Sequence, residues 1–273
     1  SIGPFLDANP DEFIWVYVFG SFVGLAGTFF FSRVNVVGEQ KQLNDEVLAA
    51  ADNSTATGFL EIIKKDRYFR RYQYSMFSAG FGNMLIEAPL VYLVTRELQA
   101  SYTMSIMLTM VVPFAVSLVA LPLWALYLDR VHVAQFRARQ SILWVLAQLL
   151  TLVGAYMGSL AWLMAGRFIM GIARGGGTLA WQLGHNDFAN PDQLSAYMGI
   201  HVTLTGVRGA IAPFLGMSLY IGIPTLGWSG IGVSVFLIAA IVSACAGVGF
   251  YRLYVALQGA GLIDINRVTE KQA

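Results

Sequence analysis

Charge and cysteine are both scarce in this sequence. Only 12% of its 273 residues are charged and 56% are hydrophobic, whereas soluble domains are about 25% charged and about 45–50% apolar. A soluble enzyme of this length and a disordered chain are therefore excluded. The single cysteine, Cys245, excludes a disulfide framework and a cysteine-rich zinc or redox site. Because it lies in an apolar run, we expect Cys245 to be buried.

Histidine and net charge are scarce as well. Three histidines make a metal centre improbable, and a net charge of +1 gives no basic surface for nucleic acid. The run Gly175–Gly177 is not a phosphate loop, because no Lys-Ser or Lys-Thr follows it. His185 and Asp187 are expected to be hydrogen-bonded loop residues. We therefore expect no enzymatic activity, no cofactor and no metal.

What the sequence has instead is seven long apolar runs. A helix crosses about 30 Å of hydrocarbon with about 20 residues, and each run is long enough for that. Barrel strands need only about 9–11 alternating residues, so the runs predict helices. The predicted spans are 13–32, 74–95, 98–128, 140–157, 160–183, 196–221 and 230–251, with a turn at Gly158–Ser159.

Basic residues in the connections predict the orientation, because cytoplasmic loops are enriched in Lys and Arg. Thirteen of the 17 Lys and Arg residues fall on one predicted side: Arg33, Lys41, Lys64, Lys65, Arg67, Arg70, Arg71, Arg130, Arg137, Arg139, Arg252, Arg267 and Lys271. Only Arg96 falls on the other side. The N-terminus is therefore predicted outside and the C-terminus in the cytoplasm.

One long connection, 33–73, separates the first span from the other six. Its second part, Phe59–Tyr72, mixes apolar and basic residues and predicts a helix on the inner leaflet, with membrane lipids as partners. A simple positive-inside anchor is the alternative. A receptor is not favoured, although Asp129–Val131 resembles a receptor motif, because one cysteine cannot form the usual disulfide. A retinal protein is not favoured either, because no lysine lies within a span.

One helix, a long basic loop and six further helices resemble the major facilitator superfamily from its sixth helix onward. In the loop after its eighth helix that family carries a weak copy of G-x-x-x-D-R-x-G-R-R. Asp129 and Arg130 match it, whereas Ala125, His132 and Val133 depart from it. A carboxylate here can cap a helix and pair with arginines. The expected gating residues are Asp129, Arg130, Arg137 and Arg139.

A glycine-proline pattern in span 196–221 resembles another family motif, G-x-x-x-G-P-x-x-G-G. Gly209, Pro213 and Gly216 match, and Ala212 and Met217 depart. Glycine allows close helix packing and proline bends a helix. Ordinary tight packing explains the pattern equally well.

The resemblance implies an all-α membrane protein with seven transmembrane helices and four parts. These are the last helix of a missing N-terminal bundle (1–33), a central cytoplasmic loop (34–73), a C-terminal six-helix bundle (74–256) and a cytoplasmic tail (257–273). The chain would begin inside a longer transporter of a bacterial inner membrane, and its first half would be a partner. The six helices could instead be the first bundle, since the two halves are pseudo-repeats.

Four charged residues fall within the predicted spans: Glu87, Arg167, Arg174 and Arg208. Each would cost about 2.5–3.5 kcal/mol at mid-bilayer, so they should face protein or water. Helical spacing adds Asn83 to the face of Glu87, and His201 and Thr205 to that of Arg208. These seven residues are the expected substrate and ion cavity.

The excess of arginine in that set favours an anionic or zwitterionic solute. Structural arginines are the alternative. Glu87 is expected to couple protons or to pair permanently with Arg208 or Arg174. The resemblance to the major facilitator superfamily implies a secondary active transporter that works by alternating access. A transporter-like subunit or assembly factor that transports nothing is the alternative.

Overall fold

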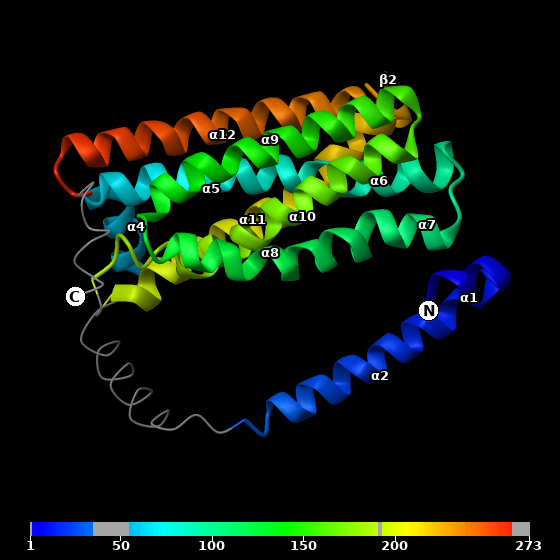
Figure 1. The fold of residues 1–273 in the computed structure, drawn as a ribbon, viewed down its shortest axis with the longest axis horizontal. Helices are drawn as coiled ribbons and strands as arrows, with labels where there is room; N and C mark the ends of the chain where they lie inside the picture. Colours follow the sequence, from blue (N-terminus) through cyan, green and yellow to red (C-terminus); the bar gives the residue numbers. More distant parts are fainter. Residues whose placement is uncertain (1, 35–54, 191–192, 264–273) are drawn as a thin grey trace.

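The computed structural model describes residues 2–34, 55–190 and 193–263, and these residues form a helical protein (Figure 1). Its strands, β1 (Gly222–Ile223) and β2 (Trp228–Ser229), form one short antiparallel hairpin. The helices are α1 (Ile2–Ala8), α2 (Phe13–Phe31), α4 (Thr55–Lys65), α5 (Arg67–Leu85), α6 (Glu87–Tyr92), α7 (Tyr102–Ile106), α8 (Val112–Leu128), α9 (Val133–Met157), α10 (Leu160–Leu183), α11 (Leu194–Ile221) and α12 (Ser234–Gly259). Two π-helical turns, η2 (Leu93–Glu97) and η3 (Met107–Val111), follow α6 and α7, and η1 (Pro10–Glu12) and η5 (Pro224–Leu226) are 3-10 turns.

Six helices among the described residues are long and apolar enough to cross a membrane. They are α2, the run Arg67–Glu97, the run Tyr102–Leu128, α9, α11 and α12. The chain is thus an all-α membrane protein, as its composition predicts. The predicted turn at Gly158–Ser159 is also confirmed, since Gly158 ends α9 at φ 60° and Ser159 precedes α10.

The seventh predicted span, 160–183, forms α10 but is not among those six. Two arginines and the run Gly175–Gly177 keep its mean hydropathy below that of those six. Its glycines lie against α8 and α9 instead of holding a phosphate. A Cβ on Gly175 would lie 2.8 Å from the carbonyl oxygen of Ser117, and one on Gly176 would lie 2.8 Å from the Trp124 ring.

The connections alternate between two ends of the bundle (Figure 1). One end carries α4, the α8–α9 and α10–α11 connections and the end of α12, and we call it the basic end. The other end carries residues 98–101, 158–159 and 222–233. Described basic residues at or near the basic end are Lys64, Lys65, Arg67, Arg70, Arg71, Arg130, Arg137, Arg139 and Arg252, whereas Arg96 lies at the other end.

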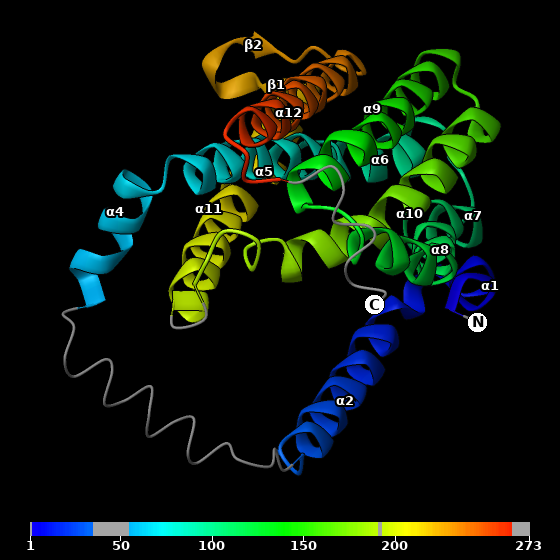
Figure 2. The same cartoon turned by 60° about the vertical axis from the view of Figure 1, so that its left-hand side comes forward.

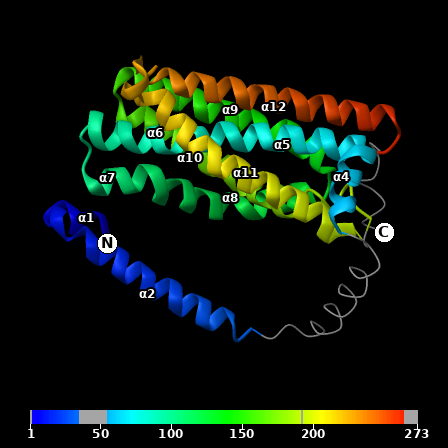
Figure 3. The same ribbon diagram turned by 180° about the vertical axis from the view of Figure 1, so that it is seen from behind.

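The basic segment Phe59–Tyr72 is not one interfacial helix. Asp66 ends α4 and caps α5, because its Oδ1 accepts hydrogen bonds from the backbone N–H of Tyr68 (3.0 Å) and Phe69 (2.8 Å). Phe69 and Tyr72 are then buried in the bundle core. The second span therefore begins at Arg67 instead of residue 74, and only α4 lies outside the bundle at the basic end (Figure 3).

The first helices contact the bundle at one end only. α1 packs on α7, where Asp7 accepts hydrogen bonds from the backbone N–H of Tyr102 (2.6 Å) and Thr103 (3.1 Å). From there α2 runs away from the other helices (Figure 2), and none of its residues is buried. Cys245 is exposed on α12, which corrects the expected burial. An apolar run in a membrane protein can face lipid as readily as a core.

The glycine-proline pattern of α11 divides into two parts. A Cβ on Gly216 would overlap the backbone of Leu85, so α11 and α5 meet closely there. At Gly209 only the Met84 sulfur lies within reach, at 4.0 Å. The expectation of close packing is therefore met at Gly216, whereas no backbone of another described helix lies within 4 Å of a Cβ placed on Gly209. Pro213 lies inside the unbroken α11.

We predict opposite results for one substitution at these two glycines. Gly216→Ala forces α11 away from α5 and should destabilise the fold by about 1–3 kcal/mol. Gly209→Ala has room, and alanine favours a helix by up to about 1 kcal/mol over glycine. Reversible unfolding of the purified protein in detergent measures both values. Equal losses at the two positions would contradict the close contact at Gly216.

Candidate functional site

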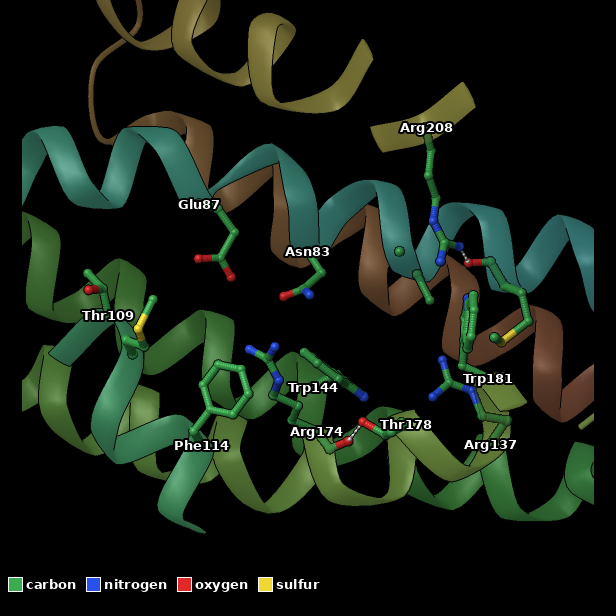
Figure 4. A pocket seen from close by; sticks show the side chains of 15 residues that line it. Asn83, Glu87, Thr109, Phe114, Arg137, Trp144, Arg174, Thr178, Trp181 and Arg208 are labelled. Carbon is green, nitrogen blue, oxygen red and sulfur yellow. Dashed lines mark hydrogen bonds between the residues drawn. The ribbon is translucent and has the colours of Figure 1, made fainter. Parts of the chain in front are cut away.

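An open cavity of about 520 Å³ on one side of the bundle is lined by charged, polar and apolar side chains (Figure 4). Asn83 and Glu87, from α5 and α6, point across it toward Arg174 and Phe114. Arg208 reaches it from α11. Its lining residues are Met76, Ala79, Gly80, Asn83, Glu87, Thr109, Met110, Phe114, Arg137, Trp144, Arg174, Gly177, Thr178, Trp181 and Arg208. Four of the seven predicted cavity residues are therefore brought together.

Arg167 lies behind this cavity instead of lining it. Only 1% of its surface is exposed, and its Nη2 lies 3.4 Å from Glu87 Oε2. The same guanidinium donates from Nε to the carbonyl of Leu108 (3.2 Å) and from Nη2 to that of Thr109 (3.1 Å). Arg167 is therefore a buried structural partner of Glu87, which corrects its place in the predicted solute cavity. The predicted partners of Glu87, Arg208 and Arg174, form no ion pair with it in the described chain.

The local backbone explains why Arg167 is needed. Pro113 has no N–H, so the carbonyl of Thr109 lacks its usual partner four residues later. The N–H of Val112 bonds to Met107 in the π turn η3, which removes the usual partner of Leu108 as well. Buried carbonyls without donors are costly, and π turns of this kind occur often at functional sites. Arg167 supplies both missing donors.

Arg174 presents its guanidinium to the cavity. Its Cζ lies 4.2 Å from the centre of the Phe114 ring, in a cation–π contact. The side chain is half-buried, and its guanidinium makes no hydrogen bond or ion pair with any described residue. Arg174 therefore brings a cation to the cavity wall, across from Glu87 but not in contact with a carboxylate of the described residues.

Arg208 is buried, and it donates from Nη1 to the carbonyl of Met76 at 2.6 Å. Its Nε has no partner in the described structure. The guanidinium lies across Gly80, where any Cβ would overlap it. The lack of a side chain at residue 80 is what lets this arginine cross from α11 to α5.

Arg137 was expected in the gating loop, but it lines the cavity. Because α9 already begins at Val133, residue 137 lies a full turn inside the helix. Arg137 is 4% exposed, bonds to Gln140, and lies 4.9 Å from the centre of the Phe250 ring. The positive-inside count cannot distinguish such a buried arginine from a loop arginine.

The other three gating residues do not gather either. Asp129 and Arg130 are exposed and form no hydrogen bond or ion pair through their side chains in the part of the chain described, and Arg139 donates to the hydroxyl of Tyr127 (2.6 Å). The carboxylate that caps α9 is Asp187, whose Oδ2 accepts from the N–H of Val133 at 2.6 Å. The latch on Asp129 is expected for a state that is open to the outside, so it stays a prediction; in this structure Asp187 is the carboxylate that contacts the start of α9.

His132 and Asp187 lie near one another at this end, with 3.9 Å between Nδ1 and Oδ2. Burial lowers the pKa of His132 below its ordinary value, and the charge of Asp187 opposes that shift. Nδ1 also accepts a hydrogen bond from the N–H of Ala134 at 3.1 Å. The imidazole is therefore neutral at pH 7 and acts as a helix cap.

His201 and Thr205 form a layer behind the cavity wall. His201 Nδ1 lies 3.0 Å from Gln73 Oε1, and Thr205 accepts from the indole N–H of Trp181 at 3.2 Å. Trp181 stands between both residues and the cavity. They orient the wall instead of touching a solute.

Sequence reasoning missed the aromatic part of the lining: Phe114, Trp144 and Trp181. Charged residues, and polar residues at helical spacing from them, were used to identify the lining, and apolar rings within apolar spans carry no such signal. Helical spacing could have found Trp181, which lies seven residues after Arg174 and so on its face. Trp144 could not be found in this way, because the predicted span 140–157 contains no charged residue.

Comparisons with protein-family models, curated proteins and solved structures find no match to this chain. Membership of the major facilitator superfamily therefore stays a prediction from residues and motifs. What the cavity can bind has to be inferred from its own side chains.

We predict that Arg167 stabilises the fold far more than Arg174 does. Arg167→Met leaves Glu87 and two carbonyls without donors and should cost about 3–5 kcal/mol. The matched variant Arg174→Met loses a cation–π contact worth about 0.5–1 kcal/mol. Reversible unfolding in detergent compares them. A smaller loss at Arg167 than at Arg174 would contradict the buried bridge.

Proposed function

We propose that this chain is part of a secondary active transporter of the major facilitator type, which moves a small solute by alternating access. The observation that carries the proposal is the polar cavity itself. Glu87, Arg174 and Arg208 line one space among helices most of which are apolar enough to cross a membrane. Charged side chains within a membrane are energetically costly, and they commonly mark the path or site of a solute or ion. Transporters hold such sites between helices near the midplane of the bilayer.

The helix arrangement supports this function. On this proposal α10 is the seventh transmembrane helix. Close packing of Gly175 and Gly176 against neighbouring helices, together with the bridge from Arg167 to Glu87, offsets the cost of placing its polar residues in the membrane. α9 and α12 lie on the far side of the bundle from α2 (Figure 2), so on this proposal they lie away from the first bundle. α2, without a buried residue, keeps its surface for the first bundle that we propose precedes it.

The orientation follows from the clustered basic residues. We propose that the basic end faces the cytoplasm of a bacterial cell, with the N-terminus of the chain outside. On that orientation α4 lies along the inner leaflet, with Lys64 and Lys65 in its last turn. Phe59, Ile62 and Ile63 pack against the bundle core.

The contact between α1 and α7 supports alternating access. It closes the end opposite to the basic end, while α2 diverges from the bundle toward the basic end (Figure 1). A transporter open to the cytoplasm has this geometry, because its bundles touch only at the outer side. The structure then represents one of two states, and the outward-open state requires the hydrogen bonds to Asp7 to break.

A disulfide across this contact tests the mechanism. A Cβ on Gly3 would lie 3.2 Å from the Cβ and 2.7 Å from the Cα of Thr103, so α1 and α7 have to separate slightly to reach the Cβ–Cβ distance of about 3.5–4.5 Å typical of disulfides. Gly3→Cys with Thr103→Cys, in a Cys245→Ala background, should form a bond that stops solute flux into proteoliposomes. Reduction should restore flux at least tenfold, and each single-cysteine variant serves as the control. Undiminished flux in the bonded protein would rule out rocking at this contact.

Cysteine labelling tests the orientation in the same background. Arg130→Cys should react with a membrane-impermeant maleimide only from the cytoplasmic side, and Ala100→Cys only from outside. The two positions lie at opposite ends of the bundle, so each controls the other. Reversed labelling would overturn the family prediction, because α2 could then not be the sixth helix.

Flux measurements also distinguish a transporter from the alternative function. A non-transporting subunit or assembly factor would show no flux of any solute, and Glu87→Gln and Arg208→Ala would leave its assembly intact. In a transporter both variants should lower flux at least tenfold, because both side chains line the cavity.

A further inference from the structure

The cavity also indicates what kind of solute it takes. We infer that it binds an organic oxyanion, a carboxylate or phosphate attached to an apolar ring or chain. The arginines of the lining attract the charged group, and Phe114, Trp144 and Trp181 hold the apolar body. This inference rests on the proposed function only in calling the ligand a transported solute, because binding to the cavity can be measured without transport.

The charge balance of the lining is the first argument. Three arginines and one carboxylate line the cavity, and that carboxylate, Glu87, is already paired with Arg167 behind the wall. Arg137, Arg174 and Arg208 have no anionic partner among the described residues. Arginine stays protonated, so the wall carries uncompensated positive charge inside an apolar bundle, which a bound anion would neutralise.

The unused hydrogen-bonding atoms give a second argument. Of the buried lining atoms without partners, three are donors: Arg137 Nε, Trp144 Nε1 and Arg208 Nε. One is an acceptor, Asn83 Oδ1. Buried donors are normally satisfied, and unsatisfied groups need an explanation. A ligand rich in acceptors fits this set, and an oxyanion bears acceptors in the geometry that guanidinium groups match.

The aromatic side chains argue for an organic ligand instead of a bare inorganic ion. Phe114 fixes the Arg174 guanidinium by a cation–π contact. Trp144 and Trp181 line the same space, and Trp181 is held in place by its bond to Thr205. A cavity of about 520 Å³ exceeds what a hydrated phosphate needs, and ligand sites of this type pair apolar walls with a few placed polar groups.

Calorimetric titration of the purified protein tests the inference with ligands of matched shape. Benzoate and phenyl phosphate are the anionic probes, benzamide is the neutral isostere, and benzylammonium is the cation. We expect at least one anion to bind ten or more times more tightly than benzamide, and benzylammonium not to bind. A preference between the two anions distinguishes a carboxylate solute from a phosphate ester.

Arginine-to-glutamine variants localise the binding. Arg174→Gln and Arg208→Gln should each weaken anion binding at least tenfold. Arg96→Gln, an exposed arginine outside the cavity, should leave it unchanged. Arg174 makes no structural hydrogen bond in the described chain, so its variant remains informative if Arg208→Gln does not fold.

Equal binding of benzoate and benzamide, absence of binding by either anion, or unchanged binding in Arg174→Gln would overturn the inference. Those results leave the transporter proposal intact if another solute shows flux. Anion binding with no flux has the opposite meaning, since it supports this inference and defeats the transporter proposal.

Discussion

The cavity depends on one buried cation. Arg167 bonds to two carbonyls that Pro113 and the π turn η3 leave without helical donors, and it reaches Glu87 with the same guanidinium. One side chain thus joins α10 to the α7–α8 run and to α6. Because Arg167 balances its charge, Glu87 can remain at the cavity wall. The charges of the other lining arginines are then not balanced by Glu87.

Glycines allow the close contacts that surround these buried polar groups. At residues 80, 175, 176 and 216 the absence of a side chain lets a guanidinium or a neighbouring backbone approach closely. Lipid does not drive helices together, so such close contacts supply much of the association energy in a bilayer. Arg167, Gly175 and Gly176 lower the mean hydropathy of α10, and the same residues hold this helix within the bundle.

Composition and hydropathy predicted the helices well, because the bilayer imposes a length and an apolarity that can be read directly from a sequence. They failed where polar residues enter the fold. Arg67–Tyr72 was placed on the membrane surface, although the Asp66 cap could have indicated that a helix begins there. Arg137 was assigned to a loop by its charge alone.

Contacts between individual residues could not be predicted from the sequence, for a different reason. Charge within the predicted spans pointed to Glu87, Arg174 and Arg208, which line one cavity, but it could not reveal that Arg167 faces backbone carbonyls. That outcome depends on how η3 and α10 meet in space. That Asp187 contacts the start of α9 in this structure could not be predicted for the same reason, since Asp129 and Asp187 both lie near the basic end and only geometry distinguishes them.

The length of α11 has a consequence for the bilayer. Its 28 residues span about 42 Å at a rise of about 1.5 Å per residue, against a hydrocarbon core of about 30 Å. The helix crosses the bundle obliquely (Figure 3), which shortens its projection along the membrane normal. Tilt responds to hydrophobic mismatch, so membrane thickness acts on α11 directly. Because Arg208 lies midway along that helix, a thinner or thicker bilayer would shift the guanidinium relative to Gly80 and Met76, and lipid composition would become a variable of the cavity itself.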